Sequence, residues 1–178
     1  MTEPIDLSGT SLVAISRESL NALRATLFRD LGGTAATYLQ DAGYSGAAQI
    51  YEAFESWLKA RGGPPPSELT LEDFARSVAE FFAASGWGML DFSVGENGVA
   101  FVESMDWAEA VTADGSELSG CYFTTGVLAD FFGRITDAQV SVMETECRSM
   151  GGERCKFLIG TAERLQQVYD EMAEQKTE

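Results

Sequence analysis

The sequence predicts an α+β domain with an antiparallel sheet and helices on one side of it. Two observations support this fold class. Apolar residues recur at helical spacing through most of residues 17–85, and from residue 87 the period changes to two. Segments 87–94 and 99–105 are therefore predicted strands, joined by residues 95–98 (GENG), whose Asn-Gly pair is a strong hairpin signal.

The N-terminal part is predicted to be helical. Residues 11–15 (SLVAI) are apolar and could form a strand or lead into a helix, and helical spacing begins at Arg17. The two glycines at 32–33 interrupt the pattern, which resumes and is expected to stop near Gly43. A further helix is predicted over residues 47–60.

A loop should follow at residues 61–67 (RGGPPPS), because two glycines and three prolines cannot continue a helix. Thr70 is a good N-cap, and Asp73 stands three residues later as in a capping box. The helix that they begin is predicted to run to about Ser85.

The C-terminal third should contain a helix, a hairpin and a last helix. The predicted segments are a helical turn at 106–111, a loop at 114–120, a helix at 121–133 ended by Gly133, a strand at 138–147, a turn at 148–154, a strand at 156–159 and a helix capped by Thr161. We expect one domain over residues 1–178, with its core at about 11–160 and a C-terminal helix and tail at 161–178.

Composition excludes several functions. With 28 acidic and 12 basic side chains the formal charge is −16, which opposes binding to nucleic acid or to an anionic membrane. The chain has no histidine, so Ser-His-Asp and Cys-His catalysis and a proximal histidine for haem are impossible. With no nucleotide-cofactor motif either, we predict no catalytic residues and no enzyme activity.

The N-terminus is polar and acidic, unlike a signal peptide, and no apolar stretch approaches about 18 residues. We therefore expect a cytoplasmic protein. Three cysteines cannot all pair, and in a reducing compartment clustered cysteines more often bind metal than form disulfides.

A metal site is one interpretation of the cysteines, which are Cys121, Cys147 and Cys155. The last two flank a glycine turn, and the first opens a helix that could pack across that hairpin. With one carboxylate they would supply four ligands, which suits structural, tetrahedral Zn²⁺. The alternative is that all three are ordinary buried residues.

The fourth ligand could be Glu144 or Glu146. In a regular strand Glu144 and Cys147 face opposite sides, so their convergence requires a bulge or a strand end near residue 146. Glu146 would share the side of Glu144. Three cations are expected to crowd the site and offset its negative charge: Arg148, Arg154 and Lys156.

At these residues the chain resembles the 4-vinyl-reductase domain family. Residues 120–133 (GCYFTTGVLADFFG) and 142–159 (VMETECRSMGGERCKFLI) resemble the family's core. Residues 35–46 (AATYLQDAGYSG) resemble its N-terminal helix and turn, and 104–110 (SMDWAEA) its strand followed by a small-residue turn. The resemblance covers roughly residues 11–160.

The resemblance implies the fold of the ligand-binding domain shared by haem nitric-oxide sensors and vesicle-transport subunits. The family includes sensor domains of phenol- and xylene-responsive activators and a bacteriochlorophyll-biosynthesis protein. In the phenol-type sensors, three cysteines and one glutamate bind zinc, which implies Cys121, Glu144, Cys147 and Cys155 here. Those sensors also use a histidine near the phenol hydroxyl, and this chain departs from them there.

The leading prediction is a zinc-stabilised sensor or carrier domain. It would bind a small hydrophobic, aromatic or tetrapyrrole-like ligand and signal through an unidentified protein partner, as a homodimer. The alternatives are an accessory factor in tetrapyrrole biosynthesis, a haem-based gas sensor and a ligand-free interaction protein. The predicted ligand contacts combine an apolar body with a polar group: Tyr38, Trp87, Trp107 and Tyr122.

Overall fold

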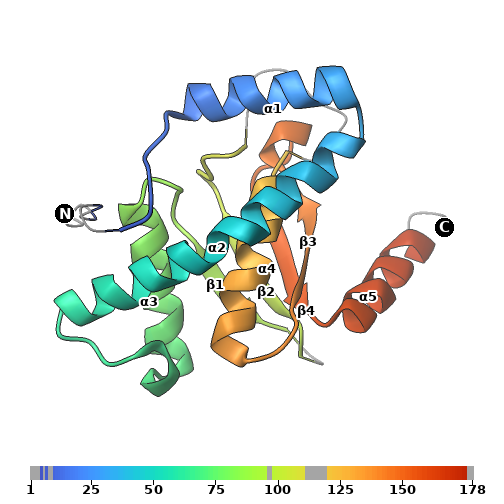
Figure 1. The fold of residues 1–178 in the computed structure, drawn as a ribbon. Coiled ribbons are helices and arrows are strands. Elements are labelled where there is room, and N and C mark those ends of the chain that lie inside the picture. Colours follow the sequence, from blue (N-terminus) through green and yellow to red (C-terminus); the bar gives the residue numbers. More distant parts are fainter. Residues whose placement is uncertain (1–4, 6, 8–9, 96–97, 111–119, 176–178) are drawn as a thin grey trace.

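The computed structural model describes residues 5, 7, 10–95, 98–110 and 120–175. Within these ranges it contains five α-helices and one four-stranded antiparallel sheet (Figure 1), which confirms the α+β class. The centre of the 95–98 turn, residue 111 of the predicted helical turn and most of the 114–120 loop lie outside the described residues.

The sheet is built from two hairpins. The first joins β1 (Asp91–Val94) to β2 (Ala100–Ser104), and the second joins β3 (Ser141–Glu146) to β4 (Cys155–Gly160). The strand order is β1-β2-β4-β3, so β2 and β4 pair at the centre and β3 lies at an edge.

One face of the sheet, here called the inner face, is covered by stacked helices. The chain between β2 and β3 contains α4 (Tyr122–Thr136), which packs on this face. Next comes α2 (Thr34–Ala60), which crosses α4, with α3 (Leu71–Ala84) beside it (Figure 1). The core between these layers is mainly aromatic: Phe54, Phe81, Phe82, Trp107, Phe131 and Phe157.

The crossing of α2 and α4 depends on two glycines. A Cβ on Gly43 would lie 2.1 Å from the carbonyl oxygen of Phe123, and one on Gly126 would lie 2.0 Å from that of Gln40. The two backbones therefore touch. The predicted helix end near Gly43 is wrong, because this glycine makes a helix–helix contact inside a continuous 27-residue helix.

Most other predicted boundaries agree with the structure. Residues 11–15 lead into α1 (Arg17–Leu31), whose N-cap is Ser16. The 61–67 loop contains a short 3₁₀ turn, η1 (Pro66–Glu68). The side chain of Thr70 caps α3 as predicted.

At its C-terminal end α4 continues past Gly133 to Thr136. The helix is capped by Asp137 in a left-handed conformation with φ of 49°. The predicted stop was therefore three residues early, because Gly133 sits within the last helical turn and its carbonyl accepts a cap hydrogen bond from Asp137.

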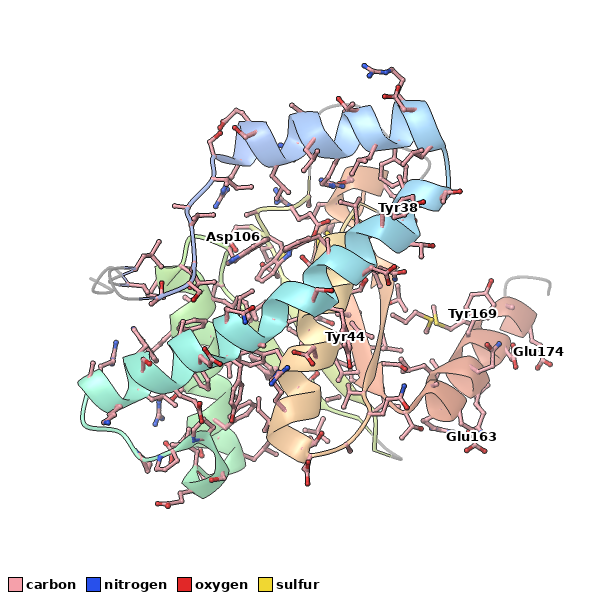
Figure 2. The ribbon with its side chains drawn as sticks, in the orientation of Figure 1. Tyr38, Tyr44, Asp106, Glu163, Tyr169 and Glu174 are labelled. Atoms are coloured by element: carbon pink, nitrogen blue, oxygen red, sulfur yellow. The ribbon has the colours of Figure 1, made fainter. Side chains whose placement is uncertain are left out.

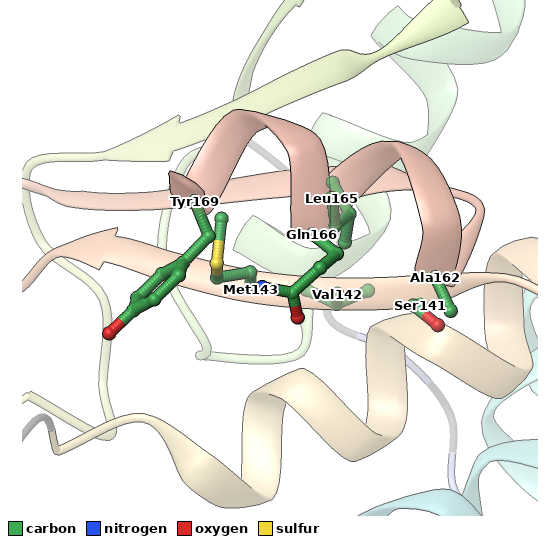
Figure 3. A pocket seen from close by; sticks show the side chains of 7 residues that line it. All are labelled: Ser141, Val142, Met143, Ala162, Leu165, Gln166 and Tyr169. Carbon is green, nitrogen blue, oxygen red and sulfur yellow. The ribbon is translucent and has the colours of Figure 1, made fainter. Parts of the chain in front are cut away.

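The last helix, α5 (Ala162–Gln175), packs against the outer face of the sheet, opposite α4. Leu165 joins Leu158 and Val99 in a small second core. An open groove of about 330 Å³ lies between α5 and β3 (Figure 3), lined by Ser141, Val142, Met143, Ala162, Leu165, Gln166 and Tyr169. None of the described helices is long and apolar enough to cross a membrane.

Candidate metal centre

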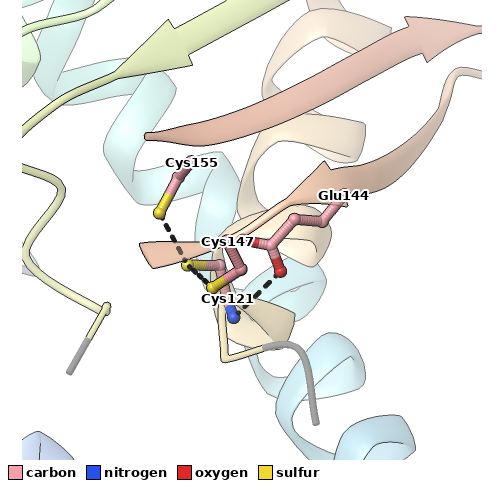
Figure 4. Close-up of side chains that lie close together, drawn as sticks. All are labelled: Cys121, Glu144, Cys147 and Cys155. Carbon is pink, nitrogen blue, oxygen red and sulfur yellow. Dashed lines mark hydrogen bonds between the residues drawn. The ribbon is translucent and has the colours of Figure 1, made fainter. Parts of the chain in front are cut away.

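Four side chains meet where α4 begins beside the β3–β4 hairpin. Cys121 directly precedes α4, Glu144 lies in β3, Cys147 follows β3 and Cys155 opens β4 (Figure 4). One sulfur or carboxylate oxygen from each lies within 4.8 Å of all the others. The three cysteines are buried and unpaired by disulfides. The four residues implied by the family resemblance are therefore close together in space.

A β-bulge explains why Glu144 and Cys147 converge. Glu144 pairs with Phe157, but the next pair in the register is Glu146 with Lys156, so Thr145 is the extra residue. The bulge reverses the alternation after residue 145. Glu144 and Cys147 consequently both face inward, whereas Glu146 shares the outer face with its partner Lys156.

A tight turn brings Cys147 and Cys155 together. It contains the 3₁₀ segment η3 (Arg148–Met150), which ends at Gly151 with φ of 85°. A Cβ on Gly152 would lie 2.9 Å from the carbonyl oxygen of Cys147, so the turn closes only with a glycine there. These glycines set the separation of the two thiols.

The N-terminus of α4 directs its N–H groups at the cluster. The backbone N–H of Cys121 donates to Glu144 Oε2 at 3.3 Å, and that of Gly120 donates to Cys147 Sγ at 3.4 Å. The helix dipole also places partial positive charge at this end. Both effects stabilise thiolate and carboxylate anions at a buried site.

Without a metal, the site holds one negative charge. Hydrogen bonds from Cys121 and Cys155 keep the pKa of Cys147 far below its ordinary value. The contacts with Cys147 and Cys155 raise the pKa of Cys121, and burial raises it further. Contact with Cys121 lowers the pKa of Cys155, but Cys147 and burial outweigh this and raise it to about 12. Burial, with the charge of Cys147, raises the pKa of Glu144 to about 9.

The donor set and its spacing fit Zn²⁺. Zinc–sulfur bonds of about 2.3 Å in a tetrahedron place sulfurs about 3.8 Å apart. Here Cys121 Sγ lies 3.9 Å from Cys147 Sγ and 3.6 Å from Cys155 Sγ. Glu144 Oε1 is buried and has no hydrogen-bond partner among the described residues, which leaves it free to bind a cation. With four protein ligands, such a metal would be structural.

The cations expected around this cluster are mostly elsewhere. Lys156 donates to Glu103 at 3.0 Å, and Arg154 contacts both Glu103 and Glu146 on the outer face. The prediction that Arg154 and Lys156 offset the charge of the site is therefore wrong, because strand alternation directs both away from it. Arg148 contributes its backbone, which hydrogen-bonds to Cys155.

Comparison with known families identifies the segment that contains this cluster. Residues 104–161 match the model of the 4-vinyl-reductase domain. This segment is a 4-vinyl-reductase domain. The match confirms the resemblance found in the sequence, and all four clustered residues lie inside the matched segment. No curated protein sequence matches the chain.

Solved structures extend the similarity to most of the chain. The phenol-responsive sensory domain of the transcription activator PoxR, solved with phenol, is 16% identical with a TM-score of 0.66, covering 91% of this chain and 82% of its own. A trafficking protein particle complex subunit 3 from Naegleria fowleri, covalently bound to palmitic acid, is 13% identical with a TM-score of 0.64, covering 81% and 91%. A vinyl-4-reductase family protein from Methanocaldococcus jannaschii is 17% identical with a TM-score of 0.53, covering 84% and 83%. At these identities the comparison establishes the fold.

Two buried charged residues beside the cluster of the 4-vinyl-reductase domain were missed by the sequence interpretation. Glu109 accepts hydrogen bonds from the backbone N–H groups of Phe123 and Thr124 at 3.0 and 2.8 Å, and so caps α4. Arg24, from α1, lies 3.5 Å from the Glu109 carboxylate. Burial raises the pKa of Glu109, and the charge of Arg24 opposes that shift. The available sequence clue was that Arg24 follows Leu20 by four residues, on the apolar side of α1.

The predicted ligand contacts are divided between the core and the surface of the 4-vinyl-reductase fold. The rings of Trp87 and Trp107 stack at 5.6 Å, and Trp107 Nε1 donates to Thr124. Tyr122 is partly buried against Phe28. Tyr38, by contrast, is 54% exposed near the start of α2 (Figure 2).

Proposed function

We propose that this chain is a zinc-stabilised domain that binds a small hydrophobic ligand and signals through a protein partner. The observation that supports the metal is the buried cluster of three cysteines and Glu144 at the start of α4. Zinc would be held by Cys121, Glu144, Cys147 and Cys155, and would fix α4 to the β3–β4 hairpin. When bound, it supplies structural cross-linking, since four protein ligands leave no open position.

The proposed ligand site adjoins an aromatic stack next to the same helix end. Trp87 lies between Trp107 and Phe123, with ring centroids 5.6 and 5.9 Å away and near-parallel planes. Trp87 is half-buried and Trp107 is buried. A planar aromatic or tetrapyrrole-like molecule would gain stacking contacts from this group. In this proposal Tyr122 borders the stack at the start of α4, and Tyr38 contacts a ligand only from the outer surface of α2.

Three further features belong to the proposal. The helical layer formed by α1 and α2 exposes large apolar side chains, among them Leu23, Leu31 and Tyr38, which favours a homodimer through this layer. Buried reduced thiols favour a cytoplasmic location. A binding function without catalysis is consistent with the fold of the phenol-responsive sensory domain.

The test combines elemental analysis with a ligand screen. Purified protein should contain about one zinc per chain. Thermal unfolding should then be followed with simple phenols and alkylbenzenes, porphyrins and palmitate, because a ligand at about 100 times its Kd adds about 2.7 kcal/mol to stability. Trp87→Ala should abolish the shift, whereas Trp57→Ala, on α2 and outside the aromatic stack, should keep it.

The outcomes separate the candidate functions. A shift with aromatics supports the sensor, and co-purified or stabilising porphyrin supports a role linked to tetrapyrroles. Protein that contains no metal contradicts the zinc centre. Protein that responds to none of the three ligand classes contradicts the ligand-binding function and favours an interaction protein.

A further inference from the structure

Arg24 occupies an unusual position for a charged residue. Of the residues in α1, all of which the structure describes, Leu20 and Arg24 are the buried ones. Arg24 is only 6% exposed. A buried guanidinium is costly unless its donors are paired, so its contacts must account for its position. The helix it belongs to is the outermost layer of the fold (Figure 1).

The guanidinium of Arg24 donates to two backbone carbonyls. One belongs to Glu109 and the other to Gly120, and these residues lie near the ends of the described segments on either side of the 111–119 gap. The Glu109 carboxylate lies 3.5 Å from Arg24 Nε and supplies the opposite charge. We call Arg24 with these two carbonyls the Arg24 clasp.

The clasp reaches the metal centre through one peptide group. The Gly120 carbonyl that accepts from Arg24 belongs to the same peptide as the Cys121 N–H, which donates to Glu144. The N–H of Gly120 donates to Cys147 Sγ. The segment that carries the Cys121 thiol is therefore held by Arg24 on one side and by two members of the cluster on the other.

Gly120 is required by this arrangement. A Cβ at this position would lie 2.5 Å from Ser149 Oγ and 2.8 Å from Arg24 Nη2. The segment is thus packed between the clasp and the η3 turn, which leads from Cys147 toward Cys155. A displacement of Arg24 cannot leave the Cys121 backbone unaffected, because no intervening side chain can absorb it.

We propose that Arg24 is a positioning residue of the metal centre, and that it couples metal binding to the docking of α1. This inference rests on the zinc site proposed above. Metal at Cys121 fixes the Gly120 carbonyl that Arg24 needs, and a docked Arg24 fixes the backbone that presents Cys121. Such coupling is reciprocal, so α1 stabilises the metal to the same degree that the metal stabilises α1.

The weak attachment of α1 makes this coupling consequential. Its other described attachments include a hydrogen bond from Arg17 to the Gly86 carbonyl and a contact between the rings of Phe28 and Tyr122. The outer side of α1 exposes Leu23 and Leu31, at 52% and 42%. Release of α1 on metal loss would change the surface that the proposed partner or second copy meets.

The test uses Arg24→Met, which keeps the apolar stem and removes the donors, and Arg24→Lys, which keeps the charge without the two-pronged geometry. The matched control is Arg29→Met, on the exposed side of the same helix, where the side chain pairs with Asp30. Zinc affinity is measured by competition with a chromophoric chelator. The Co²⁺-loaded protein reports thiolate coordination through its absorption bands.

Both Arg24 variants should bind zinc about 10- to 100-fold more weakly, as expected for a residue that supports a ligand from behind. Their Co²⁺ spectra should change, and Arg29→Met should match the wild type. Hydrogen exchange on the unmodified protein gives a measurement that needs no variant. Metal should slow exchange in residues 17–31 of the wild type, and this effect should be lost in Arg24→Met.

The outcomes distinguish this inference from the function on which it rests. Wild-type protein that binds neither Zn²⁺ nor Co²⁺ contradicts the metal centre itself. Wild-type protein that binds metal, with Arg24→Met equal to it in affinity and spectrum and with exchange in α1 independent of metal, overturns the coupling alone. Zinc affinity that falls equally in Arg29→Met would also overturn it.

Discussion

Cys155 and Lys156 are neighbours in β4, yet their side chains enter opposite environments. Cys155 points inward to a fully buried cluster of thiols at the start of α4. Lys156 points outward to a partly exposed network in which it contacts Glu103 and lies over the ring of Phe101. The same hairpin thus carries a candidate metal site on one face and ordinary ion pairs on the other.

The carboxylates on the two faces respond in opposite directions. Burial raises the pKa of Glu144 to about 9 on the inner face. A hydrogen bond from Lys156 lowers the pKa of Glu103 on the outer face. Glu103 is already neutralised by cations of the chain, whereas Glu144 has a buried oxygen without a partner among the described residues. The difference indicates that the inner carboxylate is suited to an external cation and the outer one is not.

The largest effect should come from removing an inner thiol. Cys155→Ser should reduce zinc from about one per chain to almost none. At free zinc about 1,000 times Kd, the wild type should gain about 4 kcal/mol in unfolding free energy, and the variant almost nothing. The next residue supplies the control, since Lys156→Met alters only the outer face. Elemental analysis and urea unfolding measure both, and full zinc content in Cys155→Ser would remove the cluster from consideration.

Metal binding should release about three protons per zinc at pH 7. In the metal-free state Cys147 is ionised, while the raised pKa values of Cys121, Cys155 and Glu144 keep those groups protonated. Binding requires all four to be deprotonated. Affinity should therefore rise with pH, by up to about 1,000-fold per unit below the pKa of Glu144.

Calorimetry in buffers of different ionisation enthalpy measures this proton release directly. Zinc bound by exposed carboxylates alone would release almost no protons near pH 7, since those groups are already ionised. A release near zero would thus place the metal on the acidic surface of the chain rather than in the inner cluster.

A smaller difference should separate two glutamates that are two residues apart. Glu144→Gln should weaken zinc binding by about 100-fold, because a neutral amide replaces the anionic ligand. Glu146→Gln should change affinity less than about twofold, since its side chain pairs with Arg154 on the outer face and such pairs contribute little. Equal losses in both variants would mean that the bulge at Thr145 does not exist in solution.

Local patterns were sufficient to predict the order of elements and the clustered residues. The change of period at residue 87 predicted the sheet, and the family resemblance implied Glu144 rather than Glu146. The spacing of Glu144 and Cys147 even required a bulge or strand end, which the register shift provides. These features are encoded over a few residues, so a single sequence reveals them.

Features that depend on distant partners were not predictable in this way. Gly43 resembled a helix end, but its lack of a side chain serves the contact with α4, about 80 residues away in sequence. Arg24 has its partners at residues 109 and 120, and nothing local marks it as buried. Arg154 and Lys156 were misplaced because their face depends on strand alternation in β4, which the count of nearby cations does not show.

The smallest effect should be found at the outer ion pair. Glu103→Gln should lower the free energy of unfolding by only about 0.2–1 kcal/mol at pH 7 and low salt. Because the pKa of Glu103 is lowered from its ordinary value of 4.5, its stabilising effect is present above that value. The effect is lost as the pH falls through the lowered pKa, where the folded carboxylate is protonated. Salt at about 1 M should also remove it, since the pair is partly exposed. Unfolding of both proteins across about pH 3–7, with the metal content held constant, checks this. A loss above about 2 kcal/mol that persists in salt would exceed what an exposed pair contributes. It would show that the outer network supports the metal centre through β4, and the two faces would then be coupled rather than independent.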